Sequence, residues 1–195
     1  MSIKVKKHQK QTMEEKLNTL RAGVLGSNDG ILTVVGVLVS VAAATSDRFT
    51  IFIAGLSDLL ACAFSMASGE YASVSTQKDT EKAAVAKEEQ LLKNDYEGEL
   101  AAVKEYYVNK GVTPETSIKI AKDLLNKKPL ETVVRIKYDI ELGHYLNPWD
   151  AAFSSLFSAA AGGLIPLMAM TFAPEAYKWY AVILAVAFTS ALTGY

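Results

Sequence analysis

The sequence predicts an all-α membrane protein, a transmembrane helix bundle with a cytoplasmic helical domain inserted between the second and third spans. Half of the 195 residues are hydrophobic, yet 21% are charged and the mean hydropathy is only +0.16. The charges are crowded into residues 1–21 and 73–147, which leaves four long apolar stretches. Two acidic residues, Asp29 and Asp58, nevertheless lie inside these stretches, where a carboxylate costs at least ~2.5 kcal/mol. Such residues are retained where they face a partner, a cavity or an ion path, so the pattern indicates ion movement.

The first two predicted spans are Ala22–Thr45 and Phe49–Ala72. Each has about 24 residues, or about 36 Å of helix, which exceeds the roughly 30 Å of a hydrocarbon core. Asp29 belongs to the sequence SNDG, which is also typical of a turn or helix cap, so one interpretation is that the helix begins after it. Asp58 has apolar neighbours for two turns on both sides, and that interpretation does not apply to it.

The third predicted span is Trp149–Phe172, with a kink expected at Pro166, and the fourth is Tyr177–Tyr195. The short connections within each pair of spans carry little charge, whereas the N-terminus and the middle segment carry the Lys and Arg residues. The positive-inside rule therefore places those two segments in the cytoplasm. The expected domains are a cytoplasmic N-terminal segment (1–21), transmembrane helices 1 and 2 (22–72), a cytoplasmic helical domain (73–147) and transmembrane helices 3 and 4 (148–195).

Four helices are expected in the middle segment. Ser75–Leu92 continues the second span without a Gly or Pro, and Glu97–Asn109 forms the next helix. A third helix begins at Pro114 with Thr113 as its cap and ends near residues 126–129, and Leu130–Leu142 forms the fourth and ends at Gly143. Apolar residues with helical spacing are expected to form the small core of this domain: Leu91, Leu92, Leu100, Val103, Tyr107, Ile118, Ala121, Leu124 and Leu125.

Four residues with metal-binding chemistry recur along the second span at steps of four: Asp58, Cys62, Met66 and Glu70. Carboxylate, thiol and thioether donors together suit a borderline-soft divalent ion better than Mg²⁺ or Ca²⁺. Cys62 and Met66 are equally compatible with ordinary packing, and Glu70 with a solvated carboxylate where the helix leaves the membrane. Gly26 and Gly30, four residues apart in the first span, would allow a close helix approach near Asp29.

Three long runs of the sequence are LRAGVLGSNDGILTVVGVLV (Leu20–Val39), AGLSDLLACAFSMASGEYASVSTQKDTEKA (Ala54–Ala83) and NPWDAAFSSLFSAAAGGLIPL (Asn147–Leu167). These runs resemble the vacuolar iron transporter family, and the resemblance extends from about residue 17 to 195. It implies a homodimer of five-helix protomers that moves Fe²⁺, and related ions such as Mn²⁺, Co²⁺ and Zn²⁺, out of the cytoplasm in exchange for protons. A fifth span would then be expected beyond Tyr195, and the short chain suggests a prokaryotic plasma membrane.

The resemblance also assigns roles within the spans. It places Asp29 and Met66 at the positions that coordinate the permeating ion, and Glu70 at the cytoplasmic entrance of the path. Asp58 joins this set from its position on the same stripe. No prosthetic group is expected, and the net charge of −1 shows no nucleic-acid footprint, so metal ions, protons and the membrane are the expected partners.

In the segment 73–147, the resemblance implies a metal-collecting domain with Glu-x-x-Glu pairs on its first helices. Glu88 and Glu99 match the first members of such pairs, and Glu141 matches an acid of the last helix. The second members, however, are replaced by Leu91 and Ala102, and a Met expected near residue 137 is replaced by Lys137. These departures predict only weak metal binding in this domain.

Two other functions would be compatible with parts of this sequence. Glu141-x-x-His144 is similar to a ligand pair of di-iron carboxylate proteins, but such a site needs two pairs, and the other histidine of the chain, His8, lies in the N-terminal tail. An enzyme is therefore not expected. The alternative is a membrane-anchored metal buffer or sensor that does not transport. Asp29 and Asp58 argue against it, because a simple anchor has no use for intramembrane acids.

Overall fold

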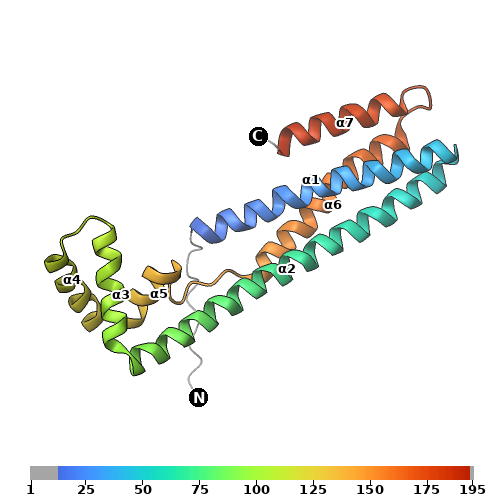
Figure 1. Ribbon diagram of the computed structural model, residues 1–195. Coiled ribbons are helices and arrows are strands. Elements are labelled where there is room, and N and C mark those ends of the chain that lie inside the picture. Colours follow the sequence, from blue (N-terminus) through green and yellow to red (C-terminus); the bar gives the residue numbers. More distant parts are fainter. Residues whose placement is uncertain (1–12, 194–195) are drawn as a thin grey trace, which may run out of the picture. The chain divides into compact units, whose positions relative to one another are not determined.

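The computed structural model describes residues 13–193, and this part of the chain consists of seven α-helices without a β-strand (Figure 1). Three of the helices, α1, α2 and α6, are long and apolar enough to cross a membrane. The chain divides into two compact units, unit 1 with the residues up to 74 and from 147, and unit 2 with residues 75–146. The helices are α1 (Met13–Ala44), α2 (Arg48–Asn94), α3 (Tyr96–Asn109), α4 (Pro114–Lys127), α5 (Pro129–Tyr138), α6 (Pro148–Phe172) and α7 (Lys178–Thr193).

Unit 1 contains α1, the first part of α2, α6 and α7. The four helices share one apolar core, which no segment could bury alone because each contributes a single face. Its fully or nearly buried members are Val34, Leu38, Ile51, Leu59, Leu167, Met170 and Val182. Large apolar side chains on the other faces of these helices remain exposed, as expected of helices that meet lipid: Phe49, Phe64, Phe157, Ile183, Leu184 and Phe188 are examples.

Small residues bring α1 and α6 into close contact, and the two helices lie side by side in Figure 1. A Cβ atom added to Gly26 would lie 2.7 Å from the backbone oxygen of Ser155, and one added to Gly30 would overlap the backbone of Ala159. On the facing helix, a Cβ at Gly163 would lie 2.8 Å from the backbone oxygen of Gly30. The close approach predicted from the glycine spacing is thus confirmed, and its partner is α6.

The interpretation that the first helix begins after Asp29 is wrong, because SNDG lies in the middle of α1. Tertiary packing overrides the turn preference of these residues, because Gly26 and Gly30 allow the backbone of α1 to lie directly against α6. The hydroxyl of Thr33 donates a hydrogen bond of 2.9 Å to the backbone oxygen of Asp29, within the helix. Asp29 therefore lies within a continuous helix and is not an N-cap residue.

The fourth predicted span is only partly matched by α7. This helix has 16 residues, or about 24 Å at ~1.5 Å per residue, which is less than the roughly 30 Å of a hydrocarbon core. Residues 194 and 195, like most of the predicted N-terminal segment (residues 1–12), lie outside the described residues. The third span agrees with the prediction, and Pro166 lies inside α6 without ending it.

Unit 2 contains the second part of α2, together with α3, α4 and α5. As predicted, α2 continues past the span as one helix of 47 residues, and Thr113 caps α4 by accepting a hydrogen bond from the backbone of Thr116. Most of the apolar positions predicted for this domain form a core, with Leu100, Val103, Ala121 and Leu125 buried in it. Val133, which was not predicted, is also buried there, whereas Leu91 and Leu124 do not belong to the core. The end of the last helix was predicted wrongly: α5 stops at Tyr138 and not at residue 142. Asp139 takes a left-handed conformation (φ 56°) there and closes the helix four residues before Gly143.

Candidate metal-binding sites

Two helices of unit 1 bring Asp29 and Cys62 together. The thiol of Cys62, on α2, donates a hydrogen bond of 3.3 Å to Oδ2 of Asp29, on α1. Cys62 is 9% exposed, so its thiol meets the carboxylate of Asp29 at a largely buried position between two apolar helices. Both groups are metal ligands once the thiol is deprotonated, and together they suit a borderline-soft divalent ion. The sequence placed them on separate stretches, and the structure brings them together.

Asp58 and Met66 flank this contact along α2, about one turn away on either side. Oδ2 of Asp58 is buried and has no hydrogen-bond partner among the described residues. A buried carboxylate oxygen without a hydrogen bond has lost its hydration and gained no interaction in return. This raises the free energy of the folded state unless a proton or a cation lies beside the oxygen. Met66 is partly buried and contributes a thioether to the same stretch of helix.

Glu70, the last acid of the stripe, forms an ion pair with Arg21 of α1, with 3.6 Å between the guanidinium Nη2 and Oε2. The Glu70 side chain is only 11% exposed, whereas that of Arg21 is 55% exposed. Glu70 is thus not the fully solvated carboxylate that one interpretation of the sequence allowed. Its partner Arg21 was missed, although it stands in the first recognisable run of the chain, because the pairing joins two helices that are distant in sequence.

These donors do not form a complete metal site within one chain. Over residues 13–193, no group of three or more His, Cys, Asp or Glu side chains lies close enough to hold a metal ion. A tetrahedral or octahedral transition metal takes four to six ligands. The Asp29–Cys62 pair could therefore contribute to such a site but would need further donors from Met66, from water or from outside the chain.

Unit 2 holds a second group of carboxylates, and this group encloses a lysine. Glu88 on α2 and Glu99 on α3 are 1% and 4% exposed. Nζ of Lys137, on α5, lies 2.8 Å from Oε2 of Glu88 and 2.7 Å from Oε1 of Glu99. The hydroxyl of Tyr138 donates a hydrogen bond of 2.8 Å to the other oxygen of Glu88. Lys137 was expected to weaken metal binding, but sequence reasoning missed Tyr138 and the direct contact of the ammonium with both acids.

The pKa shifts of Glu88 and Lys137 favour the charged forms of these two groups. Burial alone would raise the pKa of Glu88, but hydrogen bonds from Lys137 and Tyr138 outweigh it and hold the pKa below its usual range. Burial likewise opposes the charge of Lys137, yet its bonds to Glu88 and Glu99 raise the pKa of the ammonium. The hydrogen bond that Tyr138 donates to Glu88 raises the pKa of the phenol. At neutral pH the cluster therefore holds ionised Glu88 and ammonium side by side.

Glu141, the third acid assigned to this domain, does not join the cluster. The prediction that it lies on the last helix is wrong, because α5 ends at Tyr138 and residues 139–147 are not helical. Glu141 is exposed, and its backbone oxygen accepts a hydrogen bond of 3.1 Å from the backbone of His144 in a turn. A Glu-x-x-His ligand pair requires a helix to place both side chains on one face, so the similarity to di-iron proteins does not extend to the geometry.

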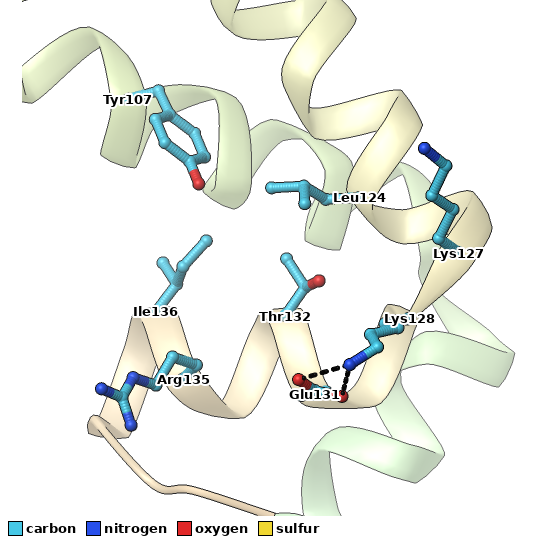
Figure 2. A pocket seen from close by; sticks show the side chains of 8 residues that line it. All are labelled: Tyr107, Leu124, Lys127, Lys128, Glu131, Thr132, Arg135 and Ile136. Carbon is cyan, nitrogen blue, oxygen red and sulfur yellow. Dashed lines mark hydrogen bonds and ion pairs between the residues drawn. The ribbon is translucent and has the colours of Figure 1, made fainter.

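A cavity of about 420 Å³ opens beside α3, α4 and α5 in unit 2, and Figure 2 shows its lining. Three cationic side chains, Lys127, Lys128 and Arg135, line it, against a single acid, Glu131. Lys128 pairs with that acid at 2.8 Å, as the dashed lines in Figure 2 mark. The remaining positive charge makes this cavity unsuitable for a metal cation, so the candidate metal ligands of the described residues remain those of the two carboxylate groups.

Apolar helices of spanning length, with acidic residues buried inside them, define a multi-pass membrane protein. The comparison with known families agrees and is more specific. The family model of the VIT family matches residues 20–195, which is nearly the whole chain. The chain belongs to the VIT family.

Sequence comparison with curated proteins finds similarity to proteins named vacuolar iron transporter or vacuolar iron transporter homolog. The chain is 38% identical over 163 residues to a vacuolar iron transporter of Acanthamoeba castellanii, which covers 84% of this chain and 59% of the relative. It is 27% identical over 178 residues to vacuolar iron transporter homolog 2.1 of Arabidopsis thaliana, with 91% and 65% covered. A shorter match to vacuolar iron transporter homolog 1 of Oryza sativa subsp. japonica reaches 46% identity over 66 residues. The chain thus spans about three fifths of the length of the first two relatives.

Proposed function

We propose that this protein transports Fe²⁺ and related divalent transition metals across a membrane, out of the cytoplasm and in exchange for protons. The meeting of Asp29 with Cys62 carries the proposal, because it joins a carboxylate and a thiol from two apolar helices at one level. The names of the relatives support iron as the cargo. Mn²⁺, Co²⁺ and Zn²⁺ accept the same donors and are further substrates under this proposal.

The ion path would run along the stripe of α2. Glu70 receives the ion at the cytoplasmic end, where Arg21 holds the carboxylate in place until a cation displaces it. Asp29, Cys62 and Met66 bind the dehydrated ion, and the unpartnered oxygen of Asp58 provides the next position. A carboxylate in such surroundings can take up a proton when the metal leaves, which is the chemical basis for exchange. The positive-inside rule supports cytoplasmic positions for the N-terminal segment and unit 2. The membrane under this proposal is the plasma membrane of a prokaryote.

We further propose that two copies of the chain form the path. One chain supplies Asp29, Cys62 and Met66 at one level, which is fewer than the four to six ligands that these metals favour. A two-fold axis beside α1 and α2 would double this set, because a symmetric interface places like residues opposite each other. It would also let the acids face a protein-lined cavity instead of lipid.

Metal flux into sealed liposomes tests the proposal. The full chain is reconstituted around a metal-quenched dye, and Fe²⁺ or Mn²⁺ is added outside. Asp29→Asn should abolish flux, and Asp58→Asn should reduce it strongly. Ser57→Ala is the matched control, since this exposed hydroxyl bonds only its own helix at Ile53, and it should leave flux unchanged.

The outcomes separate the proposal from its alternative. Wild-type flux in Asp29→Asn at equal density in the membrane would refute the assignment of the path. Metal binding by the wild type without any flux would instead favour a membrane-anchored buffer or sensor. Flux that stays proportional to protein at densities too low for two chains to meet in one liposome would refute the dimer.

A further inference from the structure

The inference concerns the cluster in unit 2 and goes beyond transport. Glu88, Glu99 and Lys137 come from three different helices, separated in sequence by 49 residues between Glu88 and Lys137 and by 38 between Glu99 and Lys137. The carboxylates are almost completely buried, and the lysine side chain retains 25% exposure. The ammonium of Lys137 therefore reaches inward to two acids that have no access to water of their own.

The contacts of this ammonium use nearly all the carboxylate oxygens. Nζ contacts Oε2 of Glu88 at 2.8 Å and both oxygens of Glu99, Oε1 at 2.7 Å and Oε2 at 2.6 Å. The remaining oxygen of Glu88 accepts the hydroxyl of Tyr138. Oε2 of Glu99 lies against the same ammonium but accepts no hydrogen bond among the described residues, so Lys137 occupies the space in which another cation would have to bind.

Two buried carboxylates require positive charge, because an unpaired charge inside a protein costs several kcal/mol. A divalent cation would balance the pair completely, whereas a single ammonium balances half of it and the phenol compensates by hydrogen bonding. The ammonium has one decisive advantage. It belongs to the same chain, so its contact with the two acids is intramolecular and does not depend on the concentration of a free ion.

We propose that Lys137 is a built-in cation that fills the divalent-cation position between Glu88 and Glu99, so that unit 2 keeps its fold without metal. The pair becomes a metal site only when this ammonium is removed. Glu88 and Glu99 then have a structural role in the wild type, and the metal-collecting role suggested by their positions is suppressed by the residue at position 137.

The test measures Mn²⁺ binding to the full chain in lipid nanodiscs, by electron paramagnetic resonance of the free ion. Lys137→Met removes the ammonium and keeps a flexible side chain of similar length, and it should gain one Mn²⁺ per chain relative to the wild type. Lys137→Arg, which keeps the positive charge, should gain none. Lys128→Met is the matched control, because this lysine of the same unit is paired with Glu131 at the surface, and it should also gain none. Adding Glu99→Gln to Lys137→Met should remove the gained ion.

Thermal unfolding gives the second readout. Without divalent ions, Lys137→Met should unfold at a lower temperature than the wild type, and Mn²⁺ should recover part of the loss. The triple variant Lys137→Met, Glu88→Gln, Glu99→Gln has no buried charge and should be stable without metal and indifferent to it.

Three results would overturn the proposal. The first is a Lys137→Met variant that binds no more Mn²⁺ than the wild type, which would make the cluster an ordinary ion pair. The second is a Lys137→Met variant that Mn²⁺ fails to stabilise while the triple variant folds. The third is a wild type that loses a bound Mn²⁺ on Glu88→Gln, which would mean that metal binds beside the lysine. None of these readouts requires transport, so they are independent of the proposed function.

Discussion

Replacement of Gly30 by alanine is expected to separate α1 from α6 and to destabilise unit 1. The added Cβ would overlap the backbone oxygen of Ala159 and would lie 2.9 Å and 3.0 Å from its C and Cα atoms. Carbon atoms prefer separations of about 3.5–4.0 Å, and a backbone inside a helix cannot rotate aside as a side chain can. The two helices must therefore move apart, and the close contact of Gly163 with Gly30 is lost with them.

The expected loss of unfolding free energy is estimated by comparing Gly30→Ala with a control substitution on the same helix, Gly36→Ala. Gly36 has no atom within 4 Å of its added Cβ, so Gly36→Ala changes the helix propensity alone. This gain, roughly 1 kcal/mol, is common to both variants and cancels in their difference. What remains is the overlap at Gly30, which we expect to cost about 1–3 kcal/mol relative to Gly36→Ala.

Stability is measured on the purified full chain in detergent, by titration with a denaturing detergent and tryptophan fluorescence, to which Trp149 of α6 contributes. Gly26→Ala, which meets the backbone of Ser155, should behave like Gly30→Ala. If Gly30→Ala is as stable as Gly36→Ala, then α1 and α6 do not pack through these glycines, and the explanation given for the helical conformation of SNDG fails as well.

Three further substitutions test the description of the helix ends and loops, each by its unfolding free energy. Thr113→Ala removes the hydroxyl that accepts the backbone N–H of Thr116 and should cost about 1 kcal/mol; an unchanged stability would mean that α4 is not capped. Asp139→Gly should stabilise unit 2 by roughly 0.5–1 kcal/mol, because glycine adopts the left-handed conformation (φ 56°) at the end of α5 without strain, and a loss would contradict this helix end. Glu175→Gln removes the charge that pairs with Arg48 at 3.1 Å and leaves the hydrogen bonds from Arg48 to the backbone oxygens of Thr171 and Ala173; it should cost less than about 1 kcal/mol, so a larger loss would show that the pair is more than a surface contact.

Local signals in the sequence predicted most of the helices. The apolar stretches, the absence of Gly and Pro after the second span, and the Thr113–Pro114 start of α4 each act within a few residues of the feature they predict. The end of α5 was predicted wrongly because Gly143 is the obvious stop signal, whereas the residue that ends the helix, Asp139, is a less frequent choice for the left-handed conformation.

The candidate sites depend on contacts that no local pattern carries. Spacing predicted the stripe on α2 but not that Cys62 meets Asp29 across 33 residues of sequence. Gly26 and Gly30 predicted a close approach without identifying α6 as the partner. Lys137 was recognised as a departure from a family pattern, yet only the fold shows that it touches Glu88 and Glu99 directly.

The two carboxylate groups differ in what balances their charge, and this difference separates their proposed roles. In unit 2, Glu88 and Glu99 contact an ammonium from their own chain, and Glu88 also accepts a hydrogen bond from Tyr138, so their counter-charge is supplied within the fold. In unit 1, the carboxylate of Asp29 accepts a hydrogen bond from the thiol of Cys62, and one oxygen of Asp58 has no hydrogen bond among the described residues. An ionised acid in apolar surroundings is stable only when a cation or a proton joins it. A carboxylate that is balanced by an external cation can also release that cation, which suits Asp29 and Asp58 to an ion path. Glu88 and Glu99 lack this property, because their cation is a side chain of the same protein.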